Sequence, residues 1–223
     1  MSRIELNTPI LGEAANQAAG LRRRMAEQGT LVVNLLSSPG AGKTALLVAT
    51  AQRLAAEFRL AALVGDIATD RDAQRLGPWM PAVQLTTGGA CHLEVPLVES
   101  GLTRLSEAVT GAVDFLFIEN VGNLVCPASF DLGEHLRVVL LAVTEGDDKP
   151  QKYPKAFRTA AACVISKIDL LPHVPFSPAA ARADAWAIRP DLAFFEVSAL
   201  SGAGLDDWCE FLIQTRRARI DAT

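Results

Sequence analysis

Aromatic residues, cysteine and long apolar runs are all scarce in this sequence. Aromatics make up 6% of the 223 residues and there are four cysteines, too few for a scaffold held together by disulfides. No apolar run approaches the ~18 residues that a membrane-spanning helix needs, and residues 1–9 lack the apolar core of a signal peptide. The net charge of −4 gives no reason to expect nucleic acid or an anionic membrane as a partner. We therefore expect a cytoplasmic protein with no membrane or nucleic acid partner, whose cysteines are free thiols or metal ligands.

The strongest motif present is the stretch SSPGAGKT at Ser37–Thr44. An apolar, β-branched run at residues 31–36 precedes it, and a helix-forming segment at residues 45–58 follows. A strand, a tight glycine loop and a helix in this order are the context that a phosphate-binding loop requires. Ser37 stands where the common pattern has its first glycine, so the match is incomplete. The stretch nevertheless predicts binding of a nucleoside triphosphate.

Each residue of this loop has a physical reason to be there. Gly40 and Gly42 let the backbone N–H groups around Ala41 turn inward toward a phosphate with no Cβ in the way. The helix that begins near Lys43 points its positive dipole end at the same anion. The Lys43 ammonium can reach the β- and γ-phosphates, and the Thr44 hydroxyl is placed to ligate Mg²⁺.

Apolar runs alternate with helical patterns along most of the chain, which indicates a parallel sheet covered on both faces. Together with the phosphate loop, this pattern predicts an α/β fold, the three-layer P-loop NTPase fold with a mainly parallel central sheet and helices on both faces. We expect one domain over residues 1–223, with an N-terminal helical extension at about 1–29 built on a helix at residues 8–28. The expected strands are 31–36, 60–64, 83–86, 115–119, 138–144, 163–167 and 194–198, and the further helices are 45–58, 94–109, 154–159, 178–188 and 205–217.

Two acidic residues follow expected strands and are candidates for the Mg²⁺ side of the site. Asp66 can hold the hydration shell of the ion or orient water, whereas Asp70 and Asp72 are interpreted as helix-capping residues. Glu119 closes the 115–118 strand in the position where nucleotide hydrolases usually carry Asp. Gly122 could sense the γ-phosphate through its N–H and rearrange when that phosphate leaves. Catalysis is therefore assigned to Lys43, Asp66, Glu119 and Gly122.

Base recognition is assigned to two further strand ends. In guanine-binding GTPases the pattern is Asn-Lys-x-Asp, and here Ser166 replaces Asn before Lys167 and Asp169. The Asp169 oxygens can accept from guanine N1–H and N2–H₂, which adenine cannot offer, and the Lys167 stem can lie along the base. Ser198-Ala199 is similar to the final base-contacting loop. These motifs indicate a GTPase, and an ATP-using enzyme of the same fold is the alternative.

A second kind of site is indicated by Cys91, His92 and Cys126. Thiolate and imidazole suit Ni²⁺ or Zn²⁺ better than Mg²⁺. Three ligands leave a tetrahedral or square-planar ion one short, so such a site is open, transient, or completed by a second chain. The alternative is three unrelated residues, with both cysteines acting as small hydrophobes.

The remaining cysteines, histidines and basic clusters are expected to be structural. Cys163 lies in the middle of a strand and Cys209 on a helix, so both are predicted to be core residues. His135 and His173 are predicted to be surface residues, and Arg22–Arg24 a solvated face of the first helix.

The chain resembles the hydrogenase nickel-incorporation GTPases (HypB), in the dimerising branch of P-loop GTPases that includes the urease nickel chaperone UreG. Six segments spread over nearly the whole chain match this family, and Cys-His with NLVCP separates it from UreG. The matching segments are Asn34–Thr44, Gly65–Leu76, Gly88–Leu93, Glu119–Glu134, Thr144–Pro154 and Ser166–Pro172.

The resemblance implies a nucleotide-dependent homodimer that binds GTP, GDP and Mg²⁺. It implies a Ni²⁺ or Zn²⁺ site at the subunit interface, built from Cys91, His92 and Cys126 of each chain. It further implies delivery of Ni²⁺ to the large-subunit precursor of a [NiFe]-hydrogenase together with a HypA-type metallochaperone, with the region of Lys152 reaching the partner's nucleotide. Ser166 and the absence of a Cys-rich or His-rich N-terminus depart from some relatives. A urease-type accessory GTPase, or a metal store with an inert nucleotide pocket, remains an alternative.

Overall fold

One parallel sheet organises the molecule. The computed structural model describes residues 8–66 and 71–220. Within this part of the chain, seven strands run in the order β3-β2-β4-β1-β5-β6-β7, and each neighbouring pair is parallel. The strands are β1 (Leu31–Ser37), β2 (Leu60–Asp66), β3 (Ala82–Thr86), β4 (Phe115–Glu119), β5 (Leu136–Ala142), β6 (Ala162–Ser166) and β7 (Ala193–Val197).

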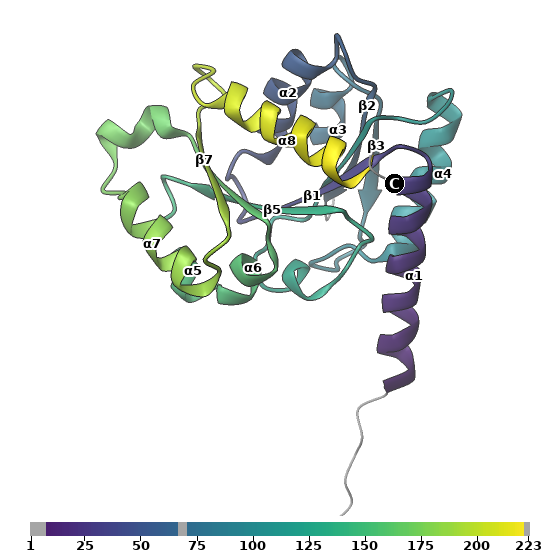
Figure 1. Cartoon of the computed structure of the whole chain (residues 1–223), viewed down its shortest axis with the longest axis horizontal. Helices are drawn as coiled ribbons and strands as arrows, with labels where there is room; N and C mark the ends of the chain where they lie inside the picture. The colour runs from purple at the N-terminus through teal and green to yellow at the C-terminus, as the bar shows by residue number, and fades with distance from the viewer. Residues whose placement is uncertain (1–7, 67–70, 221–223) are drawn as a thin grey trace, which may run out of the picture.

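Helices cover both faces of this sheet, as the alternation of strands and helices predicted. Helices α2, α3 and α8 lie on one face, and α1, α4, α6 and α7 on the other, so that the chain forms three layers (Figure 1). The bounds are α1 (Thr8–Glu27), α2 (Lys43–Leu54), α3 (Arg71–Leu76), α4 (Val95–Ala108), α5 (Lys149–Lys152), α6 (Pro154–Thr159), α7 (Pro178–Ile188) and α8 (Leu205–Arg219), with 3₁₀ turns η1 (Pro127–Ser129) and η2 (Ile168–His173).

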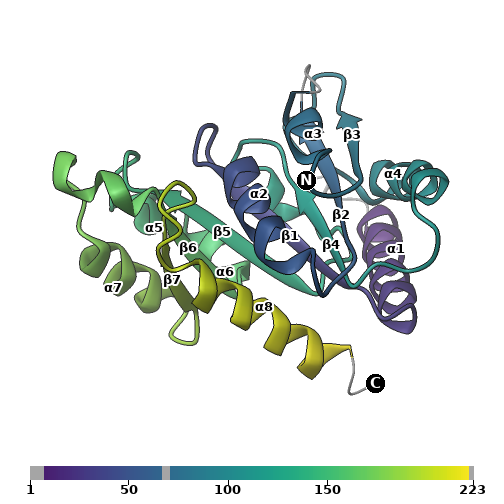
Figure 2. The same cartoon turned by 90° about the horizontal axis from the view of Figure 1, so that it is seen from above.

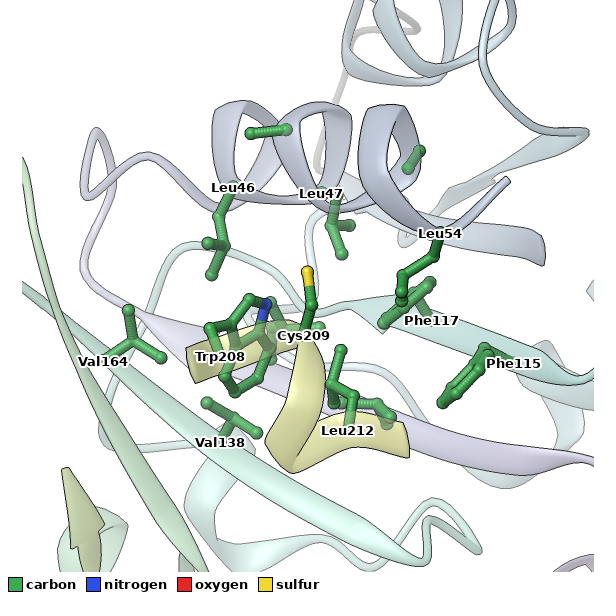
Figure 3. Close-up of a cluster of buried hydrophobic side chains, with 14 of the residues drawn as sticks. Leu46, Leu47, Leu54, Phe115, Phe117, Val138, Val164, Trp208, Cys209 and Leu212 are labelled. Carbon is green, nitrogen blue, oxygen red and sulfur yellow. The ribbon is translucent and has the colours of Figure 1, made fainter. Parts of the chain in front are cut away.

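The core under α2 and α8 is centred on Trp208, which is fully buried. Leu46 and Leu47 of α2 and Val138 of β5 surround its indole, as Figure 3 shows. The indole N–H, which would otherwise be an unpaired buried donor, donates to Thr50 Oγ1 at 3.0 Å. This contact fixes α8 against α2, the helix that follows the phosphate loop, and both helices lie over the same face of the sheet in Figure 2.

The opposite face of the sheet holds α1. Ala18, Leu21 and Met25 of α1 are buried in the same cluster as residues of β2 and α4. Arg23 and Arg24 are exposed and Arg22 is partly exposed, in agreement with the predicted solvated face. Arg22 and Arg24 also form surface ion pairs with Asp131 and Glu99, both at 2.5 Å. Helix α1 therefore packs against the rest of the chain through a stripe of apolar side chains, and ion pairs lie beside this stripe.

Strand β5 begins and ends two residues earlier than predicted. Leu136 already pairs with Val33 of β1, and the strand stops at Ala142 because a turn follows. The Glu145 N–H donates to Ala142 O at 2.9 Å, and the Glu145 carboxylate accepts from the Ala142 N–H at 3.2 Å. Local hydrogen bonding at this end overrides the apolar, β-branched character of residues 143 and 144.

His135 is not the surface residue that was predicted, whereas His173 is exposed. His135 is half-buried, its Nδ1 accepts from the Val32 N–H at 3.0 Å, and its Nε2 lies 3.0 Å from Arg22 O. Its ring therefore joins β1 to α1.

In the described part of the chain no helix combines the length and the apolarity that crossing a bilayer would require.

The parallel order brings all the predicted motifs to one edge of the sheet. The phosphate loop follows β1, Asp66 ends β2, Glu119 ends β4 and Lys167 follows β6. In open parallel sheets the carboxyl ends of the strands form the ligand-binding edge. The fold thus gathers residues that lie more than a hundred positions apart in the sequence.

Candidate functional site

The phosphate loop joins β1 to α2 as predicted, and its two glycines adopt backbone angles that other residues avoid. Gly40 has φ 76° and Gly42 has φ 95°, both in the left-handed region that favours glycine. The buried Lys43 ammonium donates to Ser37 Oγ at 2.9 Å. Burial lowers the pKa of Lys43, and the nearby negative charge of Glu119 opposes that shift. The serine in the place of the first glycine therefore gives Lys43 a hydrogen-bond partner next to its own loop.

Glu119 is a buried carboxylate with one free oxygen. Its Oε1 accepts from the Thr44 hydroxyl at 2.9 Å, whereas Oε2 has no hydrogen-bond partner, and the residue is 4% exposed. Burial raises the pKa of Glu119 to about 7, against the lowering effects of the Lys43 charge and the Thr44 hydrogen bond. A buried oxygen without a partner is costly, and one next to a threonine hydroxyl fits the oxygen ligands that Mg²⁺ prefers.

A cavity of ≈ 490 Å³ connects these groups. The half-buried Asp66 lines it from the end of β2, and Gly122 lines it from the loop after β4. A Cβ added at Gly122 would lie 3.0 Å from Pro39 Cα, so this loop packs backbone to backbone against the phosphate loop. The predicted catalytic residues Lys43, Asp66, Glu119 and Gly122 are thus brought together around one cavity.

Two residues of α3 also line the cavity, and sequence reasoning missed them. Asp72 was interpreted as a capping residue and does lie in the first turn of α3, but it faces the cavity together with Arg75. The two side chains are 3.5 Å apart, as an i, i+3 pair. That spacing, directly after the acidic end of β2, is the signal that could have identified them. Asp70 lies outside the described residues.

The base-recognition residues are connected to the phosphate loop itself. Ser166 Oγ donates to Ala41 O at 2.7 Å, so the serine that stands in place of the usual asparagine is hydrogen-bonded to the phosphate loop. Lys167 Nζ donates to Gly40 O at 2.7 Å. Lys167 is also the one described residue other than glycine with a positive φ, 61°. Backbone strain and a side-chain hydrogen bond therefore coincide at this residue.

Asp169 and Ser198 form a second, outer part of the site. Ser198 Oγ donates to Asp169 Oδ1 at 2.5 Å and accepts from the Ser201 N–H at 3.1 Å. Ser198 is buried, whereas Asp169 and Ala199 are half-buried. Asp169 therefore keeps one carboxylate oxygen held by Ser198, beyond the residues that line the phosphate cavity.

Cys91 lies next to both His92 and Cys126. The Cys91 Sγ lies 3.9 Å from His92 Nδ1, and a hydrogen bond to Cys126, followed by burial, raises the pKa of the Cys91 thiol. The His92 ring stacks on Phe130 with 3.8 Å between centroids. In the part of the chain that the structure describes, no three His, Cys, Asp or Glu side chains converge closely enough to hold a metal ion. The three residues are therefore neighbours, without forming a complete metal site in one subunit.

His92 and the two other cysteines complete the account of the predicted ligands. His92 Nε2 lies 3.2 Å from Glu94 Oε1, a contact that could not be read from the sequence. Cys163 and Cys209 are buried in the core, as predicted. Burial raises the pKa of both thiols, that of Cys209 to about 11. Neither thiol is a good metal ligand at neutral pH, because the thiolate is the binding form.

Two lysines that follow β5 differ in their exposure and in their partners. Lys149 Nζ donates to Ser38 Oγ at 3.2 Å and lies 3.3 Å from Glu145 Oε2, with the side chain 17% exposed. Lys152 is paired with Asp148 at 2.5 Å and its side chain is 60% exposed. Within one subunit it is Lys149 that approaches the phosphate loop.

The comparison with known proteins agrees with this geometry. The family described as CobW/HypB/UreG, nucleotide-binding domain, matches residues 31–196. The hydrogenase maturation factor HypB of Azotobacter vinelandii is 47% identical over 100% of this chain and 73% of its own length. The crystal structure of HypB from Helicobacter pylori in complex with nickel is 39% identical, with a TM-score of 0.88, covering 93% of this chain and 97% of that one.

A second HypB structure also matches over most of its length, whereas a more distant solved structure shares the fold alone. HypB from Archaeoglobus fulgidus still matches with a TM-score of 0.84 at 36% identity, over 92% of this chain and 99% of that chain. The LAO/AO transport system kinase matches with a TM-score of 0.57 at 18% identity, over 96% of this chain and 78% of that chain. The phosphate loop, the all-parallel sheet and the similarity over nearly the full length lead to one conclusion: this chain belongs to the HypB hydrogenase maturation factors, in the CobW/HypB/UreG family of P-loop NTPases.

Proposed function

We propose that this chain hydrolyses GTP with Mg²⁺ and uses the nucleotide state to control Ni²⁺ held between two subunits. The nickel would be destined for the large subunit of a [NiFe]-hydrogenase. One observation carries the proposal: Gly122 lines the nucleotide cavity and Cys126 follows four residues later in the same loop, with its thiol beside Cys91. Nucleotide and metal would thus act on one loop.

The proposed hydrolysis depends on charged side chains that are already in position before the nucleotide binds. The Lys43 ammonium would donate hydrogen bonds to the β- and γ-phosphate oxygens, either in place of its hydrogen bond to Ser37 or in addition to it. It would stabilise the negative charge that develops on those oxygens. Thr44 and Glu119 would supply oxygens to Mg²⁺, which neutralises phosphate charge when bound, and Asp66 would hold its water shell or orient the attacking water. Removal of the γ-phosphate would release the Gly122 N–H, and the loop that carries it packs against Pro39.

Preference for guanine over adenine rests on Asp169. One of its oxygens accepts from Ser198, which orients the carboxylate toward donors on the base. Adenine would leave such an acceptor unpaired, a loss of about 1–3 kcal/mol. Comparing GTP and ATP affinities in the wild type and in Asp169→Ala tests this assignment. A wild type that binds both nucleotides equally would instead favour the ATP-dependent alternative.

The metal proposal rests on Cys91, His92 and Cys126. Two adjacent thiols and an imidazole are donors suited to Ni²⁺ or Zn²⁺, and their incomplete convergence in one subunit favours a site that a second copy completes. The Helicobacter pylori HypB structure contains nickel, which supports nickel as the cargo. We accordingly propose a nucleotide-dependent homodimer.

The two sites can be tested together by measuring Ni²⁺ affinity with GDP and with a non-hydrolysable GTP analogue. We expect the affinities to differ about 5-fold to 150-fold, which is the usual range for allosteric coupling. Cys126→Ala should abolish the difference, whereas the buried control Cys163→Ser should keep it. Equal Ni²⁺ affinities in both nucleotide states of the wild type would show two independent sites.

The wider setting follows from the family. We propose a HypA-type metallochaperone and the hydrogenase large-subunit precursor as partners, in the cytoplasm. The HypB relatives from Helicobacter pylori are described as hydrogenase/urease maturation factors and are 39% identical over 99% of this chain in one strain, so a role in urease maturation is the second candidate. Adding the nickel-loaded chain separately to nickel-free hydrogenase precursor and to urease, and measuring which becomes active, separates the two.

A further inference from the structure

A strongly basic depression of ≈ 580 Å³ lies at the other end of the sheet from the nucleotide cavity. Two carboxylates, Asp131 and Glu134, line this depression together with six cations. The whole chain, by contrast, has a net charge of −4. We call the six cations the basic surface: Arg22, Arg137, Lys155, Arg158, Arg189 and Arg219.

The position of the basic surface separates it from the proposed GTPase site. Arg137 is the second residue of β5, and Ala161, which also lines the depression, directly precedes β6. Both residues mark the amino ends of their strands, whereas the phosphate loop follows the carboxyl end of β1. A molecule bound at this depression would therefore leave the nucleotide cavity open.

Arg22, Arg137 and Arg189 have carboxylate partners. Arg22 pairs with Asp131 at 2.5 Å, Arg137 with Glu134 at 2.5 Å, and Arg189 with Asp191 at 3.0 Å. Several of the guanidinium groups also donate to backbone carbonyls, for example Arg137 to Phe130 O at 2.7 Å. Hydrogen bonds to carbonyls satisfy N–H donors without cancelling the positive charge. The surface is therefore well ordered and still electropositive.

Lys155 and Arg158 carry the charge that is not compensated. They stand three residues apart on the short helix α6, and both are exposed. Lys155 Nζ donates to Ser129 Oγ at 2.8 Å, and among the described residues no carboxylate lies within ion-pair distance of either cation. Two neighbouring exposed cations above a depression with a basic rim form a surface suited to carboxylates.

His135 also lines the depression. Burial lowers its pKa to about 4, a hydrogen bond to Arg22 O opposes that shift, and the positive charges of Arg22 and Arg219 add to the lowering. The imidazole is thus kept neutral in surroundings that disfavour a further cation. This agrees with a positive potential over the depression.

We propose that the basic surface docks an acidic segment of a partner protein, with Lys155 and Arg158 as its main contacts. A single small oxyanion would need several unused donors that converge on one point, but most guanidinium groups here already donate to carbonyls or carboxylates. A long nucleic acid would be repelled by the acidic remainder of the chain. Several carboxylates spaced along a peptide match cations distributed over a depression of this size.

The test uses the full chain and a fluorescein-labelled peptide of six glutamates, with binding followed by fluorescence anisotropy at low salt. The variant Lys155→Glu/Arg158→Glu reverses the two uncompensated charges. The matched control Arg104→Glu/Arg217→Glu reverses two exposed cations outside the depression and changes the net charge by the same amount. Guanine nucleotide affinity, measured for all three proteins, confirms that each is folded.

We expect the wild type to bind the peptide with an affinity that falls as salt is added. The Lys155/Arg158 variant should bind at least about tenfold more weakly, and the control within about twofold of the wild type. Equal losses in both variants would overturn the proposal, because only total charge would then matter.

Three other outcomes would also overturn it. Displacement of the peptide by millimolar inorganic phosphate, but not by chloride at equal ionic strength, would indicate a small-oxyanion site. Tighter binding of a single-stranded oligonucleotide than of the peptide would indicate a nucleic acid surface. Weaker self-association of the Lys155/Arg158 variant, with no peptide bound by the wild type, would indicate that a second copy of this chain occupies the surface.

Discussion

Replacing Glu119 by glutamine should make the nucleotide-free protein less sensitive to pH. The Glu119 carboxyl is buried beside Thr44 and Lys43, one of its oxygens has no partner, and its pKa is raised from 4.5 to about 7. A folded-state pKa above the unfolded value means that the folded protein binds the extra proton. Ionising this carboxyl therefore destabilises the folded state. The free energy of unfolding falls as pH rises from about 4.5 through about 7.

The size of the effect follows from the two pKa values. Each unit of difference between the folded and unfolded states corresponds to about 1.4 kcal/mol. Evaluated between about pH 5 and about pH 8, ionisation of Glu119 should lower the free energy of unfolding by about 2–3 kcal/mol. Glutamine can still accept the Thr44 hydrogen bond through its oxygen, but it does not ionise, so Glu119→Gln should lack this loss.

Urea unfolding of both proteins at a series of pH values, without nucleotide and with a chelator, measures the difference. The stability of the variant relative to the wild type should increase by about 2–3 kcal/mol from about pH 5 to about pH 8. Adding Mg²⁺ and nucleotide to the wild type near pH 7 should release a proton, because a metal ligand must be deprotonated. If the stabilities of the two proteins changed with pH in parallel, the pKa of the buried Glu119 carboxyl would not be raised, and the interpretation would be refuted.

Three further substitutions test individual contacts of the loop. Lys43→Ala should slow GTP hydrolysis at least about 10²-fold in a phosphate-release assay, and near-normal turnover would show that the loop assignment is wrong. Ser166→Ala removes the hydrogen bond to Ala41 O and should weaken binding of a fluorescent guanine nucleotide about fivefold; unchanged affinity would mean that the bond does not position the loop. Gly122→Ala places a Cβ 3.0 Å from Pro39 Cα and should cost about 1–3 kcal/mol in nucleotide binding, seen by calorimetry, whereas wild-type affinity would show that the loop can move aside freely.

The sequence was sufficient for the sheet because burial patterns there are local. Runs such as 115–119 are buried on both faces, and continuous apolar character of this kind predicts a strand in a parallel sheet. The phosphate loop was equally predictable, since the glycines and Lys43 are contiguous. These features depend on neighbours in the chain, and each could be read without knowing what packs against it.

Contacts between distant segments could not be read in this way. The half-buried state of His135 depends on Arg22 of α1, more than a hundred residues away, and the pairing of Arg22 with Asp131 depends on how α1 docks. Asp72 and Arg75 reach the cavity only because the short helix α3 is turned toward it. Apolar periodicity is too weak over six residues to predict such a helix or its orientation.

The backbone of Lys167 has a consequence for engineering this protein. A residue other than glycine at φ 61° is strained by about 1–2 kcal/mol, and the strain is retained where the ammonium holds Gly40 of the phosphate loop. Glycine at this position would relieve the strain and release the loop at the same time. A directed-evolution screen that rewards thermostability alone should therefore select Lys167→Gly, and its products should be heat-resistant proteins with impaired nucleotide binding.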